Sequence, residues 1–251
     1  MNDGKKVYSY RDVDIISDEI QSEEPIIIEG FPGIGLIGNI TSQHIVSELN
    51  AEHRGIMNSR FFPPVAILTN GEITSPVRIY ECTEKNLVIL LSNVVVDPIF
   101  SYDVGKAIVD WAQEINMQEM VSLAGIITMS GEQKVFGGAT NEDLLDKIKE
   151  FVELFEAGTI AGIPGTVMAE CFARKLPGIG LLGETSTPNP DPRAAAEVVN
   201  TLNSIYGWDI KVDKLLEEAE KIELELQKLA EEMKTGVDGV PIPRRDLPMY
   251  G

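Results

Sequence analysis

The sequence has few of the residues that mark secreted or membrane proteins. Only two cysteines, Cys82 and Cys171, occur among 251 residues, and both lie in apolar segments. We therefore expect buried thiols in a reducing compartment rather than a disulfide. The most apolar run, residues 87–96, is interrupted by Ser92 and Asn93 and is far shorter than the ~20 residues of a membrane span. The first residues also lack the apolar core of a secretory signal, so we expect a cytoplasmic protein without a membrane partner.

Basic residues are scarce as well. The chain has 21 Lys and Arg against 40 Asp and Glu, which gives a formal net charge of −19. Binding to nucleic acid is not expected, because neutralising phosphates requires a cationic surface. The acidic excess is uneven: residues 235–251 carry two basic and two acidic side chains, so this last segment is balanced.

Catalytic motifs are absent from the sequence. The only two histidines, His44 and His53, are predicted to lie in a helix and a turn and share no face. No HExxH, CxxC, GxSxG or P-loop pattern occurs, and no nucleophile lies beside a base. We therefore predict that the protein is not an enzyme and needs neither a metal nor a cofactor.

Apolar segments of two kinds alternate along the chain. Short β-branched runs predict strands, and longer runs with helical periodicity predict helices. The predicted strands are Pro25–Glu29, Val65–Thr69, Val77–Cys82, Leu87–Leu91, Val121–Met129 and Ile179–Leu182. The predicted helices are Leu36–Leu49, Tyr102–Met117, Asn141 to near Phe155, Pro164–Leu176 and Pro192–Tyr206. This alternation predicts an α/β three-layer sandwich with a mainly parallel central sheet covered on both faces.

The chain divides into an α/β domain (1–208), a heptad helix (209–234) and a flexible tail (235–251). In the second segment apolar residues recur at spacings of three and four, which is the a/d pattern of a coiled coil. Self-association or a helical hairpin is favoured, and a helix lying on its own domain is the alternative. The heptad positions are Val212, Leu215, Ala219, Ile222, Leu226, Leu229 and Met233.

A glycine motif, GIGLIG at residues 33–38, follows a predicted strand and precedes a predicted helix. In that context its glycines could cradle a pyrophosphate. The heptapeptide from Pro32 recurs almost unchanged at residues 177–183, where it cannot open such a helix and is interpreted as a turn. Tight backbone packing is therefore favoured for Gly33, Gly35 and Gly38, and a ligand loop is the alternative.

The glycine motif and several other segments resemble those of a known protein family. Residues 29–38, 124–131, 158–165 and 184–192 resemble segments of the PAC2 family of proteasome assembly chaperones. The resemblance implies an α/β fold similar to that of nucleoside phosphorylases, but without a recognised activity. It also implies a partner, because archaeal members include homologues that bind the 20S proteasome.

The last three residues, Met249, Tyr250 and Gly251, read hydrophobic–Tyr–any. This looks like the C-terminal motif with which proteasome activators dock between α-ring subunits. A free carboxylate can pair with a pocket lysine, while Tyr250 offers a flat apolar body with a hydroxyl and Met249 a pliable contact.

Two functional hypotheses follow. In the first, a homo-oligomer, with a tetramer favoured, presents several tails to the 20S α ring and aids core-particle assembly or opens the gate without ATP. In the alternative, the glycine loop serves a phosphorylase-like protein or enzyme that binds a nucleoside, nucleotide or phosphate.

Overall fold

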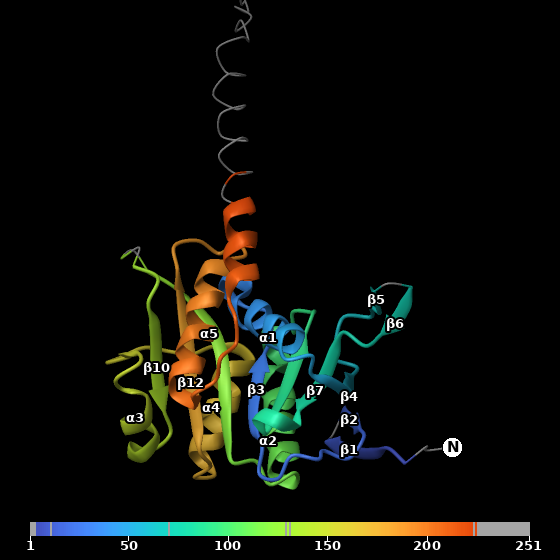
Figure 1. Cartoon of the computed structure of the whole chain (residues 1–251). Coiled ribbons are helices and arrows are strands. Elements are labelled where there is room, and N and C mark those ends of the chain that lie inside the picture. Colours follow the sequence, from blue (N-terminus) through green and yellow to red (C-terminus); the bar gives the residue numbers. More distant parts are fainter. Residues whose placement is uncertain are drawn as a thin grey trace, which may run out of the picture.

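The computed structural model describes residues 4–10, 12–69, 71–128, 130, 132–222 and 224. Helices and strands alternate over most of this range (Figure 1). The α-helices are α1 (Ile37–Glu48), α2 (Ser101–Glu114), α3 (Glu142–Ile148), α4 (Gly162–Ala173) and α5 (Pro192–Tyr206). Residues 213–222 are also helical. Among the described residues, every helix is too short or too polar to cross a lipid bilayer.

Most strands belong to one large sheet. Its order is β1-β2-β4-β7-β8-β3-β9-β12-β10-β11, and β5 and β6 form a separate hairpin. The strands are β1 (Lys6–Tyr10), β2 (Val13–Ser17), β3 (Ile26–Gly30), β4 (Glu52–Ser59), β5 (Ile67–Thr69), β6 (Glu72–Thr74), β7 (Val77–Cys82), β8 (Leu87–Ser92), β9 (Glu119–Ile127), β10 (Val135–Ala139), β11 (Glu153–Leu154) and β12 (Gly178–Thr185).

The sheet is mixed, which corrects the expectation of a mainly parallel one. Within the described residues, parallel pairing joins β8, β3, β9 and β12 in the centre, and β10 with β11 at one edge. The remaining pairs, from β1 through β8 and between β10 and β12, are antiparallel. The parallel centre is the part whose strands are buried on both faces, as the burial of β3 and β8 shows.

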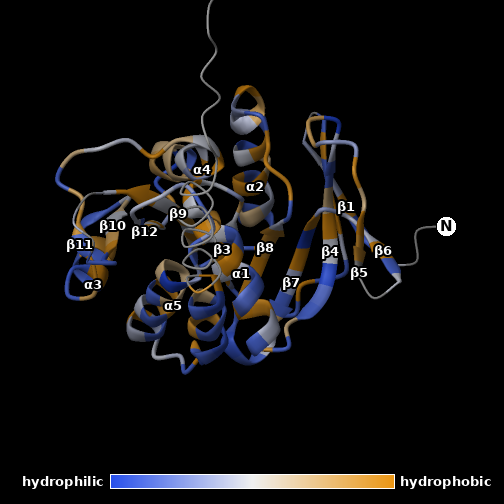
Figure 2. Ribbon diagram, turned by 90° about the horizontal axis from the view of Figure 1, so that it is seen from above, coloured by the Kyte–Doolittle hydropathy of each residue, from blue (hydrophilic) through white to orange (hydrophobic). Residues whose placement is uncertain are grey.

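Helices cover both faces of the centre, so the fold has the three layers expected (Figure 2). On one face α2 packs against α4, and their apolar side chains form a core with Ile27 and Leu90 of the sheet. On the other face α1 packs against α5 over Ile28 and Ile89, and apolar side chains of α3 belong to the same core near β10. Successive strand residues point to opposite faces, and this alternation divides the isoleucines of β3 between the two cores.

Several elements differ from their predictions. His53 lies in strand β4 and not in a turn, and its ring contacts Tyr80 of β7 edge to face. The helix that Asn141 caps ends at Ile148 instead of near Phe155. The second glycine-rich heptapeptide is not a turn, because residues 178–183 lie inside the fully buried strand β12. The two cysteines are buried and free, as expected.

The first heptad positions pack on the body of the same chain. Leu215 belongs to the core under α1 and α5, and Ala219 is buried too. His44 of α1 also meets the carbonyl oxygen of Lys211 through Nε2 at 2.6 Å, and Lys214 pairs with Glu48 at 2.5 Å. This part of the helix, which begins at residue 213, therefore lies on its own domain. Leu226, Leu229 and Met233 lie outside the described residues.

Candidate functional site at the carboxyl ends of the parallel strands

The glycine motif forms a tight turn directly after the central strand β3. Residues Ile34–Leu36 make one turn of 3-10 helix that runs into α1. Gly35 has φ of 63°, which glycine adopts at little cost. Leu36 has φ of 50°, a conformation that is uncommon for a residue with a side chain. The sequence pattern gave no signal for the left-handed Leu36.

Gly38 allows α1 to approach the sheet closely. A Cβ atom on Gly38 would lie 2.6 Å from the carbonyl oxygen of Leu123 in β9, which is far inside van der Waals contact. Gly33 differs, because a Cβ atom there would meet no atom within 4 Å. Close backbone packing, which the sequence favours for the glycines of this motif, is therefore found at Gly38, whereas Gly33 faces open space.

The open space at Gly33 belongs to a pocket of about 360 Å³. Its walls come from the ends of β3 and β9, the segment after β8, and the first turn of α4. The lining residues are Phe31, Pro32, Gly33, Ile34, Gly38, Val95, Val96, Pro98, Ser101, Leu123, Ala124, Gly125, Ile126, Thr159, Ile160, Ala161, Gly162, Ile163, Pro164 and Leu182. Gly33 and Gly38 thus line the pocket and Gly35 does not. In open α/β sheets, ligands bind at this end of the strands.

The pocket wall and rim are apolar. None of the lining residues carries a charged side chain, and Ser101 and Thr159 are the hydroxyl-bearing residues among them. Large apolar side chains also stand exposed here: Ile34 is 42%, Val95 62% and Ile99 75% exposed. Apolar side chains that gather in this way at a pocket mark a contact surface more often than singly scattered ones do.

A buried acid lies beneath the pocket. Glu29 of β3 is fully buried; Oε1 accepts a hydrogen bond from the Ser122 hydroxyl of β9, and Oε2 has no partner among the described residues. Ala124, on the same face of β9 as Ser122, lines the pocket. Burial raises the pKa of Glu29 to about 7, although the hydrogen bond from Ser122 opposes this shift. Near neutral pH the group therefore changes charge. The sequence predicts Glu29 only as a strand residue and does not reveal its buried carboxyl group.

A second buried acid, Glu184 at the end of β12, fixes a neighbouring segment. Its carboxylate accepts hydrogen bonds from the hydroxyls of Thr128 and Ser130 and, at 3.0 Å, from the backbone N–H of Lys134. This carboxylate thus organises the connection from β9 to β10. In the part of the chain that the structure describes, no three His, Cys, Asp or Glu residues come together as a metal site.

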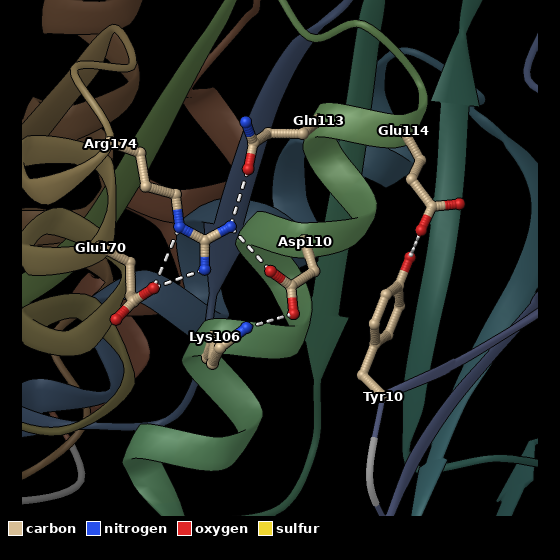
Figure 3. A network of polar contacts seen from close by, with 7 residues as sticks. All are labelled: Tyr10, Lys106, Asp110, Gln113, Glu114, Glu170 and Arg174. Atoms are coloured by element: carbon tan, nitrogen blue, oxygen red, sulfur yellow. Dashed lines mark hydrogen bonds and ion pairs between the residues drawn. The ribbon is translucent and has the colours of Figure 1, made fainter.

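A polar network fixes the two helices whose N-termini flank the pocket (Figure 3). The guanidinium of Arg174, just past α4, donates to Asp110 and Gln113 of α2 at 2.7 Å and to Glu170 of α4. Lys106 donates to the other oxygen of Asp110 at 2.7 Å. Burial opposes ionisation of Asp110, but its hydrogen bonds to Lys106 and Arg174 dominate and lower its pKa. Figure 3 also shows Tyr10 of β1 donating to Glu114, which ties the sheet edge to the end of α2.

The predicted docking residues Met249, Tyr250 and Gly251 lie outside the described residues. Of the predicted oligomerisation residues, Val212, Leu215, Ala219 and Ile222 are described.

Comparison with known proteins gives a consistent result. The sequence profile of the PAC2 family matches residues 27–230. An uncharacterised protein of Methanocaldococcus jannaschii is 34% identical over 232 residues, which cover 92% of this chain and 95% of that protein. A second protein of the same organism is 29% identical over 259 residues, covering 95% and 98% of the two chains.

Two solved structures from Pyrococcus furiosus have the same fold. PbaA, an archaeal homologue of proteasome-assembly chaperone, is 32% identical with a TM-score of 0.82, over 91% of this chain and 95% of that one. PbaB, an archaeal proteasome activator, is 27% identical with a TM-score of 0.78, over 88% and 99% of the two chains.

Proposed function

This chain belongs to the PAC2 family, and from that premise we propose that it is a non-enzymatic partner of the 20S proteasome in the cytoplasm. It binds the α ring through Met249, Tyr250 and Gly251, and thereby aids assembly of the core particle or opens its gate without ATP. The observation that carries this proposal is the likeness to PbaA and PbaB over nearly the whole of all three chains.

The chemistry of the C-terminus supports the proposed contact. Gly251 leaves its α-carboxylate sterically free for a lysine, Tyr250 combines a planar ring with a hydroxyl, and Met249 adapts to an apolar surface. Residues 235–251 could extend at most about 60 Å. They also carry no net side-chain charge, so they approach another protein without the repulsion of the acidic body.

Several tails on one particle would strengthen a weak single contact. Leu226, Leu229 and Met233 continue the heptad pattern beyond the buried Leu215 and Ala219, and we assign them to self-association, with a tetramer favoured. Once one tail is bound, the others are held at high local concentration, which raises the overall affinity.

The test is binding to 20S core particle from the same organism, with the full chain compared with a chain lacking Met249 to Gly251. We expect the truncation to abolish binding in a pull-down. Asp238→Ala, a change in the same tail but outside the motif, serves as the matched control and should bind normally. Undiminished binding by the truncated chain would exclude the tail mechanism.

Two readouts separate the possible roles. Gate opening is measured as faster hydrolysis of a fluorogenic peptide by mature 20S, and assembly as faster formation of core particle from separate α and β subunits on native gels. An activator affects the first and a chaperone the second.

Binding of a small molecule is a second candidate function, favoured by the pocket beside Gly33 and Gly38. Its uncharged lining suits an apolar ligand better than a nucleotide or phosphate. A saturating ligand should raise the melting temperature in a thermal-shift screen, and no stabilisation across nucleosides, nucleotides and apolar metabolites would count against this function.

A further inference from the structure

We propose that the apolar pocket beside Gly33 is one half of a channel that binds an elongated, uncharged apolar molecule. Residues 155–162 form the lid of this channel, and the side chain of Ile160 closes it in the middle. The proposal rests on the second candidate function above, because it names the class of small molecule and extends the site. It is independent of the contact with 20S.

A second pocket, of about 310 Å³, adjoins the apolar pocket of about 360 Å³. Its lining consists of residues 155–160, Gly138 of β10 and Leu182 of β12. Thr159, Ile160 and Leu182 line both pockets, so these side chains form the wall between them. Each pocket alone lies near the lower limit of ligand sites, about 300 Å³, whereas the two joined approach the middle of the usual range.

Two glycines leave room for the second pocket on the sheet. Gly138 lies directly opposite Gly180 of β12, a residue of the second glycine-rich heptapeptide. A Cβ atom on Gly138 would meet no atom within 4 Å, and one on Gly180 would lie 3.2 Å from Cδ1 of Ile160. Leu182 is on the same face of β12 as Gly180, because residues two apart in a strand point the same way. The sheet therefore lacks side chains beneath the lid, and the tip of Ile160 fills part of that space.

The lid is anchored at its first residue and begins a helix at its last. The ring of Phe155 packs edge to face on Phe136 of β10, with 5.5 Å between the ring centroids. Gly162, the first residue of α4, has φ of 73°, which glycine adopts at little cost. Residues 156–159 are exposed, and Ile160 is half-buried. Short exposed segments of this kind open at low free energy, so Ile160 can leave the wall without unfolding the body.

The lining of the two pockets selects an uncharged molecule. Glu156 is the charged residue among the side chains that line them, and it is exposed. A charged ligand would lose its hydration here without gaining a partner in return. The position of Ile160 selects the shape: a narrow chain reaches both pockets once this side chain moves, whereas a compact ring system fits in one of them.

The test compares two uncharged alcohols that have the same number of carbon atoms, the linear decanol and the compact adamantanol. Their dissociation constants are measured by titration calorimetry with the full chain and its variants. We expect both alcohols to bind the native chain. The two differ in hydrophobicity, so the decisive comparison is the effect of each variant on one probe at a time.

Two glycine variants block the pockets separately. Gly33→Phe fills the apolar pocket and Gly138→Phe the second pocket. Both should fold, because a Cβ atom at either position meets nothing within 4 Å. We expect adamantanol to be weakened by Gly33→Phe alone, and decanol to be weakened roughly tenfold by each variant, since each removes part of its buried apolar area. A loss of decanol binding in only one of the two variants would overturn the channel.

Ile160→Ala tests the lid. A site that must first open binds its ligand more weakly in proportion to the rarity of the open state, so removing the closing side chain should tighten decanol binding roughly tenfold. Adamantanol, which needs one pocket, should not gain. Ile73→Ala is the matched control, because Ile73 is 77% exposed and lines neither pocket. Unchanged or weaker decanol binding by Ile160→Ala would show that Ile160 does not close a channel.

Failure of the channel and failure of the candidate functions give different results. If neither alcohol binds the native chain, binding of small apolar molecules is refuted together with the channel. If adamantanol binds while decanol responds to one glycine variant only, the pocket is a small-molecule site without a channel. Neither result bears on 20S, which is tested by removing Met249 to Gly251.

Discussion

Gly33 and Gly38 belong to one motif but have different surroundings, so they should respond differently to the same change. Gly38→Ala would gain about 1 kcal/mol of helix propensity, yet its methyl group would lie 2.6 Å from a backbone oxygen that cannot easily move. We expect a net loss of about 2–3 kcal/mol in the free energy of unfolding. Gly33→Ala should change it by less than about 0.5 kcal/mol. Chemical denaturation of both variants checks this, and equal losses would contradict the packing role of Gly38.

The buried carboxyl of Glu29 should make stability depend on pH. Its pKa is about 7 in the folded protein against an ordinary value of 4.5, so the folded state holds the proton more tightly. Stability from this group is therefore greatest below pH 4.5, falls as pH rises, and levels off above pH 7.

The matched comparison is Glu29→Gln, which keeps the shape and removes the titration. Relative to this variant, the wild-type protein should lose up to about 3 kcal/mol of unfolding free energy between pH 4.5 and pH 8. Denaturant titrations at both pH values measure the difference. If the difference in unfolding free energy between the wild-type protein and Glu29→Gln does not change with pH, the pKa of Glu29 is not raised in the folded protein.

At the scale of elements, Arg174 joins α2 to α4 through partly buried partners. Its side chain is 22% exposed, as is Asp110, and Glu170 is 15% exposed. Arg174→Met should destabilise the protein by about 1–2 kcal/mol, because it leaves two carboxylates without their shared donor. Arg60→Met is the control: its ion pair with Asp12 is 70% and 43% exposed, and its loss should cost well under 1 kcal/mol. Similar thermal melts for the two variants would refute a structural role for the network.

The sequence predicts two kinds of element well: strands that are buried on both faces, and helices that have one apolar face. Strands β3 and β8 are continuous apolar runs, and helices α2 and α5 have one clear apolar face. Strands β1, β2, β4 and β10 were not predicted, since they are half-exposed or contain glycine, and their pattern is weak. The end of α3 was misplaced because Val152 packs against Gly137 and Glu153–Leu154 pairs with β10. Sheet pairing there overrides an apolar pattern that also fits a helix.

The candidate site could be predicted only in part, because its residues come from segments that lie far apart in the sequence. Gly33 and Gly38 were recognisable, because their spacing is local. Val95 and Ile163 line the same pocket, but they follow β8 and open α4, and only the sheet order brings these segments together. Glu29 gave no signal either, because the pKa of a strand glutamate depends on burial that the sequence does not state.

At the scale of the whole molecule, we propose two roles for the predicted heptad helix: packing on the chain's own body and self-association. Leu215 is buried in the chain's own core, so Leu215→Ala should destabilise the fold by about 2–4 kcal/mol. Leu226→Glu with Leu229→Glu should instead leave the melting temperature nearly unchanged and reduce the native mass to that of a monomer. The same double variant should bind 20S at least tenfold more weakly, because avidity is lost. Native mass spectrometry checks the first outcome, and an unchanged mass would refute self-association through these residues.

The position of β3 in the sheet also affects how the chain is made. Ile26 pairs with Leu87 of β8 on one side and with Glu119 of β9 on the other. A ribosome adds about 5–20 residues per second, so β3 waits on the order of 5–20 seconds for its second partner to be synthesised. During that interval the nascent chain carries three consecutive isoleucines without a complete sheet around them. We therefore expect the central strand of this protein to need shielding while the chain is still being translated.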